Sequence, residues 1–174
     1  PERYLKQVMD IFSQTALEIC EGQQWDMEFE TRNDVTVPEY MEMIRLKTSV
    51  LLSAALKIGA VLGGASEDDA RKLYDFGIKM GLAFQLQDDY LDVYGDSKVF
   101  GKNIGGDILC NKKTFMLINA LALADGIQRK ELEKWIASTA FCPEEKIKAV
   151  TALYDKIGIG GICEEKNNAF FVGG

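Results

Sequence analysis

The helical spacing of apolar residues, which runs through most of the chain, is the feature that most constrains its fold. Near the start of the chain, Leu5, Val8 and Phe12 recur at intervals of three and four residues, which places them on one face of a helix. No run of segments alternates apolar and polar residues as half-buried strands do. Residues 38–63 and 66–95 are apolar on nearly every side, so we expect these two helices to lie inside a bundle. The predicted fold class is all-α.

Caps and breakers give the expected limits of the helices. Pro38 suits the first turn of one helix, and Ser66 with Asp69 suits the N-terminus of the next. Residues 95–111 contain four glycines and no periodicity, which predicts a loop. Residues 157–174 contain five glycines, and we predict no helix there. The predicted helices cover residues 1–30, 38–63, 66–95, 112–124, 128–138 and 143–156.

Two glycines fall within predicted helices. Gly22 occupies the middle of the first helix, where glycine costs about 1 kcal/mol relative to alanine, so we predict that another segment packs closely against it. Gly81 shares a face with the acidic residues described below, and we expect it to leave open space above the helix.

The composition excludes several classes of function. The chain has 174 residues, of which 47% are hydrophobic, enough to bury the core of one domain. It has no histidine, which removes Ser-His-Asp catalysis and His-ligated zinc. A net charge of −7 argues against nucleic acid as a partner. Four widely spaced cysteines without a C-x-x-C pair indicate reduced thiols and a cytoplasmic location, and no stretch predicts a transmembrane segment.

The third predicted helix carries an acidic cluster on an otherwise apolar surface. Gln85, Asp88, Asp89 and Asp92 fall within an arc of roughly 100° around the helix. Carboxylates in apolar surroundings are costly unless a cation neutralises them, and oxygen ligands of this kind suit Mg²⁺. The sequence thus predicts a magnesium site, while a solvated acidic stripe remains the alternative.

Lysines accompany the glycine-rich loop and the second helix. Lys102 lies among glycines, and Lys112 opens the next predicted helix, where backbone amides favour an anion. These lysines could clamp a diphosphate beside a metal ion, or they could simply be solvated. Lys47 and Thr48 lie within an apolar stretch of the second helix, and by itself such a lysine would extend its amine to the surface.

Four blocks in this order resemble the trans-isoprenyl diphosphate synthases of the polyprenyl synthetase family. They are GQxxD-like residues 22–26, the Lys47-Thr48 pair, FQxxDDxxD at residues 84–92, and the GK…GDI…NKKT run over residues 101–114. The resemblance implies a helical bundle of the isoprenoid synthase type around a central cavity, and a homodimer. It also implies that residues 1–174 are the C-terminal part of one such domain, incomplete at the N-terminus.

The resemblance also implies roles for individual residues. It makes Asp88 the main Mg²⁺ ligand, with Asp89 and Asp92 in support. Lysine side chains bind the allylic diphosphate, and polar groups face the developing carbocation. The diphosphate ligands implied are Lys47, Lys102 and Lys112, and the groups facing the carbocation are Gln85 and Thr48. Together, Lys47, Thr48, Gln85 and Lys102 are the implied catalytic residues.

The implied reaction condenses an allylic prenyl diphosphate with isopentenyl diphosphate by ionisation, condensation and elimination. The family's first aspartate-rich motif is absent from these residues, because Asp68-Asp69 is followed by Ala70-Arg71-Lys72. The isopentenyl diphosphate site is expected in the same absent part. A non-catalytic, synthase-like subunit that dimerises or binds a prenyl diphosphate is the alternative function. A terpene cyclase is less favoured, because FQxxDDxxD with the GDI loop resembles chain elongation.

Overall fold

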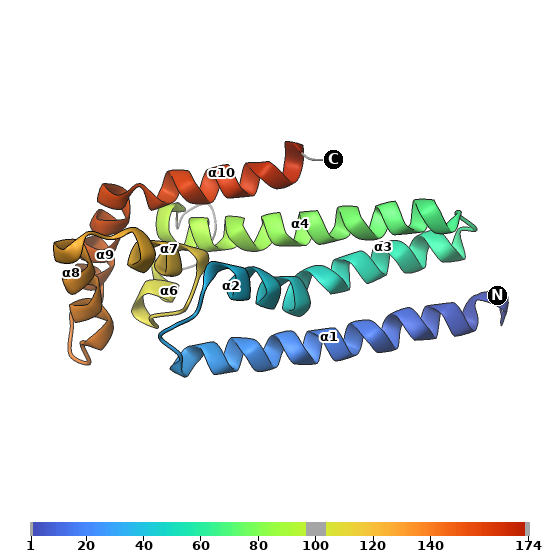
Figure 1. Ribbon diagram of the computed structural model, residues 1–174, viewed down its shortest axis with the longest axis horizontal. Coiled ribbons are helices and arrows are strands. Elements are labelled where there is room, and N and C mark those ends of the chain that lie inside the picture. Colours follow the sequence, from blue (N-terminus) through green and yellow to red (C-terminus); the bar gives the residue numbers. More distant parts are fainter. Residues whose placement is uncertain (1, 97–103, 173–174) are drawn as a thin grey trace. The chain divides into compact units, whose positions relative to one another are not determined.

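A computed structural model describes residues 2–96 and 104–172, and every regular element within those ranges is a helix (Figure 1). The predicted all-α fold class is therefore confirmed. The elements are η1 (Glu2–Tyr4), α1 (Leu5–Thr31), α2 (Val37–Ile44), the π-helical η2 (Arg45–Ser49), α3 (Val50–Leu62), α4 (Glu67–Tyr94), α6 (Gly106–Leu109), α7 (Phe115–Leu123), α8 (Gly126–Ala137), α9 (Pro143–Ile157) and α10 (Ile159–Val172).

The chain forms two compact units. Unit 1 comprises Pro1–Asn33, Met41–Gln85 and Asn168–Gly174, and unit 2 comprises Asp34–Tyr40 and Leu86–Asn167. Helices α2, α4 and α10 contribute residues to both units. The polar groups of the predicted metal site, Asp88, Asp89 and Asp92, all belong to unit 2.

Side-chain caps begin several helices where the sequence places them. The Ser66 hydroxyl accepts the backbone N–H of Asp69 and donates to its carboxylate, which confirms the predicted cap of α4. At the start of α2, the Thr36 hydroxyl accepts the backbone N–H of Glu39, and the backbone N–H of Thr36 donates to the Glu39 carboxylate. Asp125 caps α8 through the amides of its first turn. Each cap satisfies amides that have no partner within the helix.

The glycine-rich stretch differs from the predicted loop in two places. A short helix, α6, forms within residues predicted to be irregular, after Gly105 adopts a left-handed conformation with φ 82°. Helix α7 begins at Phe115 rather than Lys112, because Thr114 is extended and accepts the N–H of Leu117 as the N-cap. Lys112 therefore precedes the helix instead of opening it.

The tail prediction was wrong, since α10 is a helix of 14 residues. Gly158 ends α9 in the left-handed region, with φ 83°, and the chain resumes as a helix at the next residue. Contacts within unit 2 stabilise α10: the buried Cys163 thiol donates to the carbonyl of Leu86. Gly160 lies against the ring of Tyr94, where a Cβ would be 3.1 Å from the nearest ring atom. Packing therefore overrides the weak local helix preference of glycine.

Glycines in unit 1 allow helices to approach closely. A Cβ at Gly22 would overlap the backbone of Leu46 and Lys47, so the predicted close packing is confirmed. Gly81 has no open space above it, contrary to the prediction, because a Cβ there would lie 2.6 Å from the Cα of Ser49. Helix α4 uses this position for contact within unit 1 and not for a ligand.

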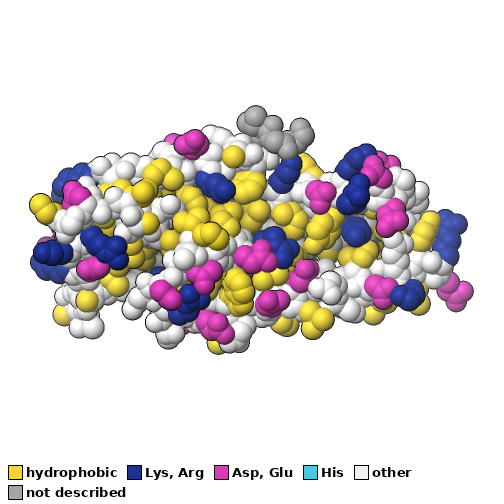
Figure 2. Space-filling model, in the orientation of Figure 1, with side chains coloured by type: hydrophobic (Ala, Val, Ile, Leu, Met, Phe, Trp, Pro, Cys, Tyr) yellow, Lys and Arg dark blue, Asp and Glu magenta, His cyan; other side chains and the backbone are white. Residues whose placement is uncertain are grey.

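Helices α3 and α4 were predicted to lie inside a bundle, but both expose large apolar side chains. In unit 1, α4 exposes a stripe of large apolar residues whose Phe84 side chain is 61% exposed, and α3 exposes leucines. Hydrophobic side chains gather in patches on the face shown in Figure 2. The exposed residues are Leu51, Leu52 and Leu62 on α3, and Leu73, Phe76, Met80 and Phe84 on α4. Among the described residues, no helix combines the length and apolar character that crossing a membrane requires.

The glycine contacts give a matched test of the packing. Gly22→Ala is expected to lower the free energy of unfolding by about 1–3 kcal/mol, because the added methyl group overlaps a neighbouring backbone. Gly59→Ala, in open space on α3, is expected to raise it by up to about 1 kcal/mol. Urea denaturation of both variants measures the difference, and equal stabilities would contradict this packing.

Candidate functional site

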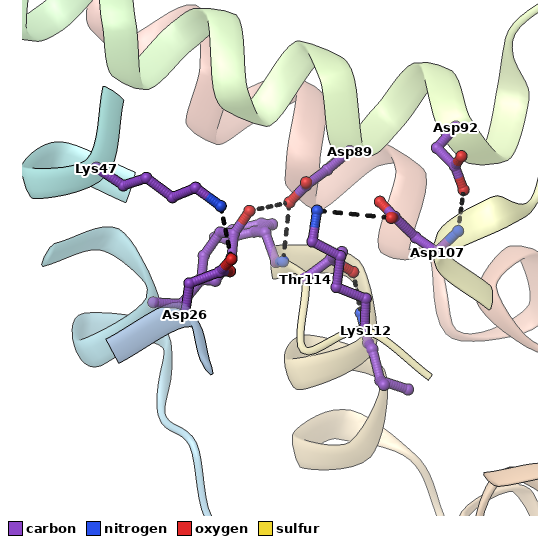
Figure 3. A network of polar contacts seen from close by, with 10 residues as sticks. Asp26, Lys47, Asp89, Asp92, Asp107, Lys112 and Thr114 are labelled. Carbon is purple, nitrogen blue, oxygen red and sulfur yellow. Dashed lines mark hydrogen bonds and ion pairs between the residues drawn. The ribbon is translucent and has the colours of Figure 1, made fainter. Parts of the chain in front are cut away.

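Asp89 is the buried centre of a hydrogen-bond network in unit 2 (Figure 3). Its side-chain oxygen Oδ2 accepts the Tyr40 hydroxyl at 2.6 Å and the backbone N–H of Phe115 at 3.0 Å. Burial raises the pKa of the Asp89 carboxyl to about 7, and the two hydrogen bonds oppose this shift without cancelling it. Burial and the Asp89 charge raise the pKa of Tyr40, so its hydroxyl remains the donor.

The local sequence explains why Asp89 lies at the start of α7. The first amides of a helix have no intrahelical acceptor. Thr114 accepts one of them, from Leu117, and Asp89 accepts another, from Phe115. The anion that we expected near this helix start is thus matched, at Phe115, by the protein's own carboxyl group.

Three further carboxylates lie near one another and are called here the carboxylate face: Asp88, Asp92 and Asp107. The Asp92 carboxylate accepts the backbone N–H of Asp107 at 3.0 Å, which joins α4 to the start of α6. Burial raises the pKa of Asp107, Lys112 opposes the shift, and the charges of Asp92 and Asp88 add to it. The negative charges therefore act on one another, and a cation bound here would relieve that repulsion.

A fixed turn carries Lys112 to this face. The Lys112 ammonium lies 3.6 Å from the Asp107 carboxylate (Figure 3). Asn111, in the left-handed region at φ 54°, donates its side-chain amide to the carbonyl of Ile136. Lys146, only 1% exposed, donates to the side-chain oxygen of Asn111 at 2.7 Å. This buried lysine holds the turn from within unit 2.

Lys47 and Thr48 lie in the π-helical segment η2 of unit 1. Extra-wide turns of this kind often occur at functional positions. The Lys47 ammonium forms an ion pair with Asp26 of α1 at 2.6 Å, and both side chains are partly exposed (Figure 3). Because of this ion pair, Lys47 has a specific partner and does not simply extend into solvent. Gln85, which lies on α4, is half-buried.

The structure divides the predicted site residues that it describes between the two units. In unit 2, Asp88 and Asp92 lie close enough to Asp107, the partner of Lys112, for their charges to act on it, while the Asp89 side chain is buried. The predicted residues of unit 1 are Lys47, Thr48 and Gln85. Lys102 lies outside the described residues.

The sequence motifs did not single out Asp26, Tyr40 and Asp107 individually, although all three belong to these networks. Asp107 belongs to the GDI run, and Asp26 to the GQxxD-like block, so the resemblance pointed to both stretches without assigning either residue. No local pattern marks Tyr40, whose acceptor is 49 residues away in sequence.

The described carboxylates supply only part of the coordination shell that Mg²⁺ requires. Within residues 2–96 and 104–172, no three potential ligand side chains converge on one point. Mg²⁺ is often held by one or two carboxylates with water and substrate phosphates, so Asp88, which is exposed, fits such an ion. The interior cavity bounded by Asp89, Lys112 and Lys146 has a volume of about 10 Å³, enough for about one water molecule and not for a diphosphate.

Comparison with known proteins identifies the family. The polyprenyl synthetase profile matches residues 2–154. The geranylgeranyl diphosphate synthase of Methanosarcina mazei is 52% identical over 120 residues, which make up 69% of this chain and 37% of that protein. A crystal structure of a geranylgeranyl pyrophosphate synthase matches with a TM-score of 0.88 and 44% identity, covering 95% of this chain and 51% of that one. The chain belongs to the polyprenyl synthetase family.

A second solved structure adds information about ligands. It is a polyprenyl synthase from Caulobacter crescentus complexed with calcium and isoprenyl diphosphate, with a TM-score of 0.86 and 27% identity. The match covers 94% of this chain and 50% of that one. The chain thus spans between 37% and 51% of the length of these three relatives.

The raised pKa of Asp89 predicts a pH-dependent stability. A carboxyl whose pKa rises from 3.8 to about 7 on folding stabilises the protein at low pH, and this stabilisation is lost as the pH rises towards 7. The loss is about 1.4 kcal/mol per pH unit between those values. We expect the parent protein to lose stability relative to Asp89→Asn between pH 4.5 and 7, and no further difference above pH 7.5.

Melting temperatures of both proteins, without divalent metal, measure this difference. The Asn side chain can accept the same two hydrogen bonds, and the comparison cancels the titration of other groups that face Asp89, such as Asp107. If the melting temperatures of parent and variant changed in parallel with pH, the raised pKa of Asp89 would be contradicted.

Proposed function

We propose that the protein is a trans-prenyltransferase that condenses an allylic prenyl diphosphate with isopentenyl diphosphate. The observation that carries the proposal is the carboxylate face of unit 2, with Lys112 beside it, in a chain of the polyprenyl synthetase family. Carboxylates arranged with a lysine suit the binding of a metal-bound diphosphate. A relative complexed with calcium and isoprenyl diphosphate supports this chemistry.

Mg²⁺ is the proposed cofactor, held by Asp88 with support from Asp92. When bound, it would neutralise the charge that develops on the departing diphosphate. Asp107 adds negative charge to the face, and its ion pair with Lys112 would keep that ammonium beside a phosphate bound there. Asp89 accepts hydrogen bonds within the protein.

The remaining predicted residues retain the roles that the family resemblance gives them. Lys47, Lys102 and Lys112 would bind the allylic diphosphate as ammonium groups. Gln85 and the Thr48 hydroxyl would orient their oxygens towards the developing carbocation, which lowers its energy. Asp26 would hold the Lys47 ammonium through their ion pair before substrate binds. A homodimer, which the resemblance also implies, is part of the proposal.

Asp88→Ala tests the function most simply. In the protein at its natural length, we expect prenyl transfer to fall by at least about 100-fold, because the main metal ligand is lost. Asp75→Ala, which removes an exposed aspartate from the same helix, is the matched control and should retain the parent rate. Rates are measured with a radiolabelled isopentenyl diphosphate. An Asp88→Ala rate within about tenfold of the parent, with helicity intact, would remove Asp88 from the mechanism.

Lys102→Ala tests the diphosphate assignment independently of the metal. We expect weaker binding of the allylic diphosphate, by about tenfold or more, because one charged hydrogen-bond donor to the phosphates is lost. Affinity is measured by titration calorimetry with and without Mg²⁺, with Lys166→Ala on α10 as a control lysine. An unchanged affinity of the Lys102→Ala variant for the allylic diphosphate would mean that Lys102 is a solvated lysine and not a diphosphate ligand.

A further inference from the structure

Tyr40 and Asp89 form a buried contact beside the carboxylate face. Their side chains are 2% and 3% exposed, respectively. The Tyr40 hydroxyl and the Phe115 N–H donate to the same oxygen, Oδ2 of Asp89, at 2.6 and 3.0 Å. One carboxyl oxygen therefore connects the first turn of α2, the final turns of α4 and the N-terminus of α7, all within unit 2.

We infer that Tyr40 is a positioning residue for the carboxylate face, that it acts through Asp89, and that the Asp89 carboxyl serves this contact and is not a metal ligand. The inference rests on the proposed function, because the face that Tyr40 positions is the proposed metal site.

Because Asp89 belongs to α4, its hydrogen bond with Tyr40 also affects how the neighbouring residues of that helix are oriented. Successive side chains of an α-helix are about 100° apart around its axis. Holding Asp89 at two donors therefore fixes the rotation of this end of α4, and with it the directions in which Asp88 and Asp92 project. Asp92 in turn accepts the N–H of Asp107, so the rotation of α4 also determines where the α6 carboxylate lies.

Burial argues against a metal at Asp89. Mg²⁺ gives up its water reluctantly and usually keeps several water ligands. The cavity that Asp89 borders has a volume of only about 10 Å³, room for about one water molecule. Asp88, one position earlier, is exposed and can receive a hydrated ion with its phosphates. Two adjacent aspartates thus have different surroundings and different parts in the site.

The test compares Asp88→Asn, Asp89→Asn and Tyr40→Phe in the protein at its natural length. The probe is inorganic diphosphate with Mg²⁺, followed by titration calorimetry at a temperature well below the melting point of every variant. Both hydrogen bonds to Asp89 use one oxygen, so an Asn carbonyl can accept both, whereas at Asp88 the same substitution removes a charged metal ligand. Tyr40→Phe keeps the ring and removes only the donor.

We expect Mg²⁺-dependent diphosphate binding to weaken by at least about 30-fold in Asp88→Asn and by no more than about threefold in Asp89→Asn. We expect a loss of about tenfold in Tyr40→Phe, since the face loses its alignment. A loss in Asp89→Asn as large as in Asp88→Asn would make Asp89 a metal ligand and overturn the inference. So would parent affinity in Tyr40→Phe. Parent affinity in Asp88→Asn would instead overturn the proposed function itself.

A double-mutant cycle tests whether Tyr40 acts through Asp89. If it does, Tyr40→Phe raises the Mg²⁺ concentration needed for half-maximal diphosphate binding by about tenfold in the parent. In an Asp89→Ala background, the same substitution raises it by less than about twofold, because the partner is already absent. The readout is the Mg²⁺ concentration that gives half-maximal diphosphate binding, which a purely structural loss of stability does not move while the protein stays folded. Equal Tyr40→Phe costs in the two backgrounds would overturn the inference. Circular dichroism confirms folding of each variant.

Discussion

The buried carboxyl group of Asp89 is the interaction on which the arrangement of unit 2 depends. A carboxyl in an apolar interior is costly unless donors satisfy it. Here the donors are the Tyr40 hydroxyl and the first amide of α7, which would itself lack an acceptor within its helix. Each group thus offsets part of the cost of burying the other, and the position of α4 in this unit follows from their geometry.

The carboxylate face differs from Asp89, because its charges repel one another and are only partly offset. Asp88, Asp92 and Asp107 are close enough to affect one another's charge, and Lys112 offsets only part of it. Such a cluster retains its charges more easily when a cation arrives than when it stands alone. The buried Lys146 donates to Asn111, in the turn that carries Lys112, so a contact from the interior supports the position of that charge.

How much of this could be predicted from the sequence depended on how local each signal was. Apolar spacing and caps predicted the helices, because both act within a few residues, as the Ser66 cap illustrates. They did not predict α10, whose stability depends on distant contacts such as Cys163 with Leu86. The aspartate motif pointed to Asp88 and Asp92 by their residue type and spacing. It could not distinguish Asp89 from them, because the burial of Asp89 depends on Tyr40, 49 residues away in sequence.

A crystal structure of the protein at its natural length, grown with Mn²⁺ and inorganic diphosphate, would show which aspartate holds the metal. Anomalous scattering locates the metal without relying on the positions of the side chains. We expect a metal peak at Asp88, between its carboxylate and the diphosphate, with the Tyr40 hydroxyl still hydrogen-bonded to Asp89. A peak coordinated by Asp89, with the Tyr40 contact broken, or no metal at Asp88, would contradict this expectation.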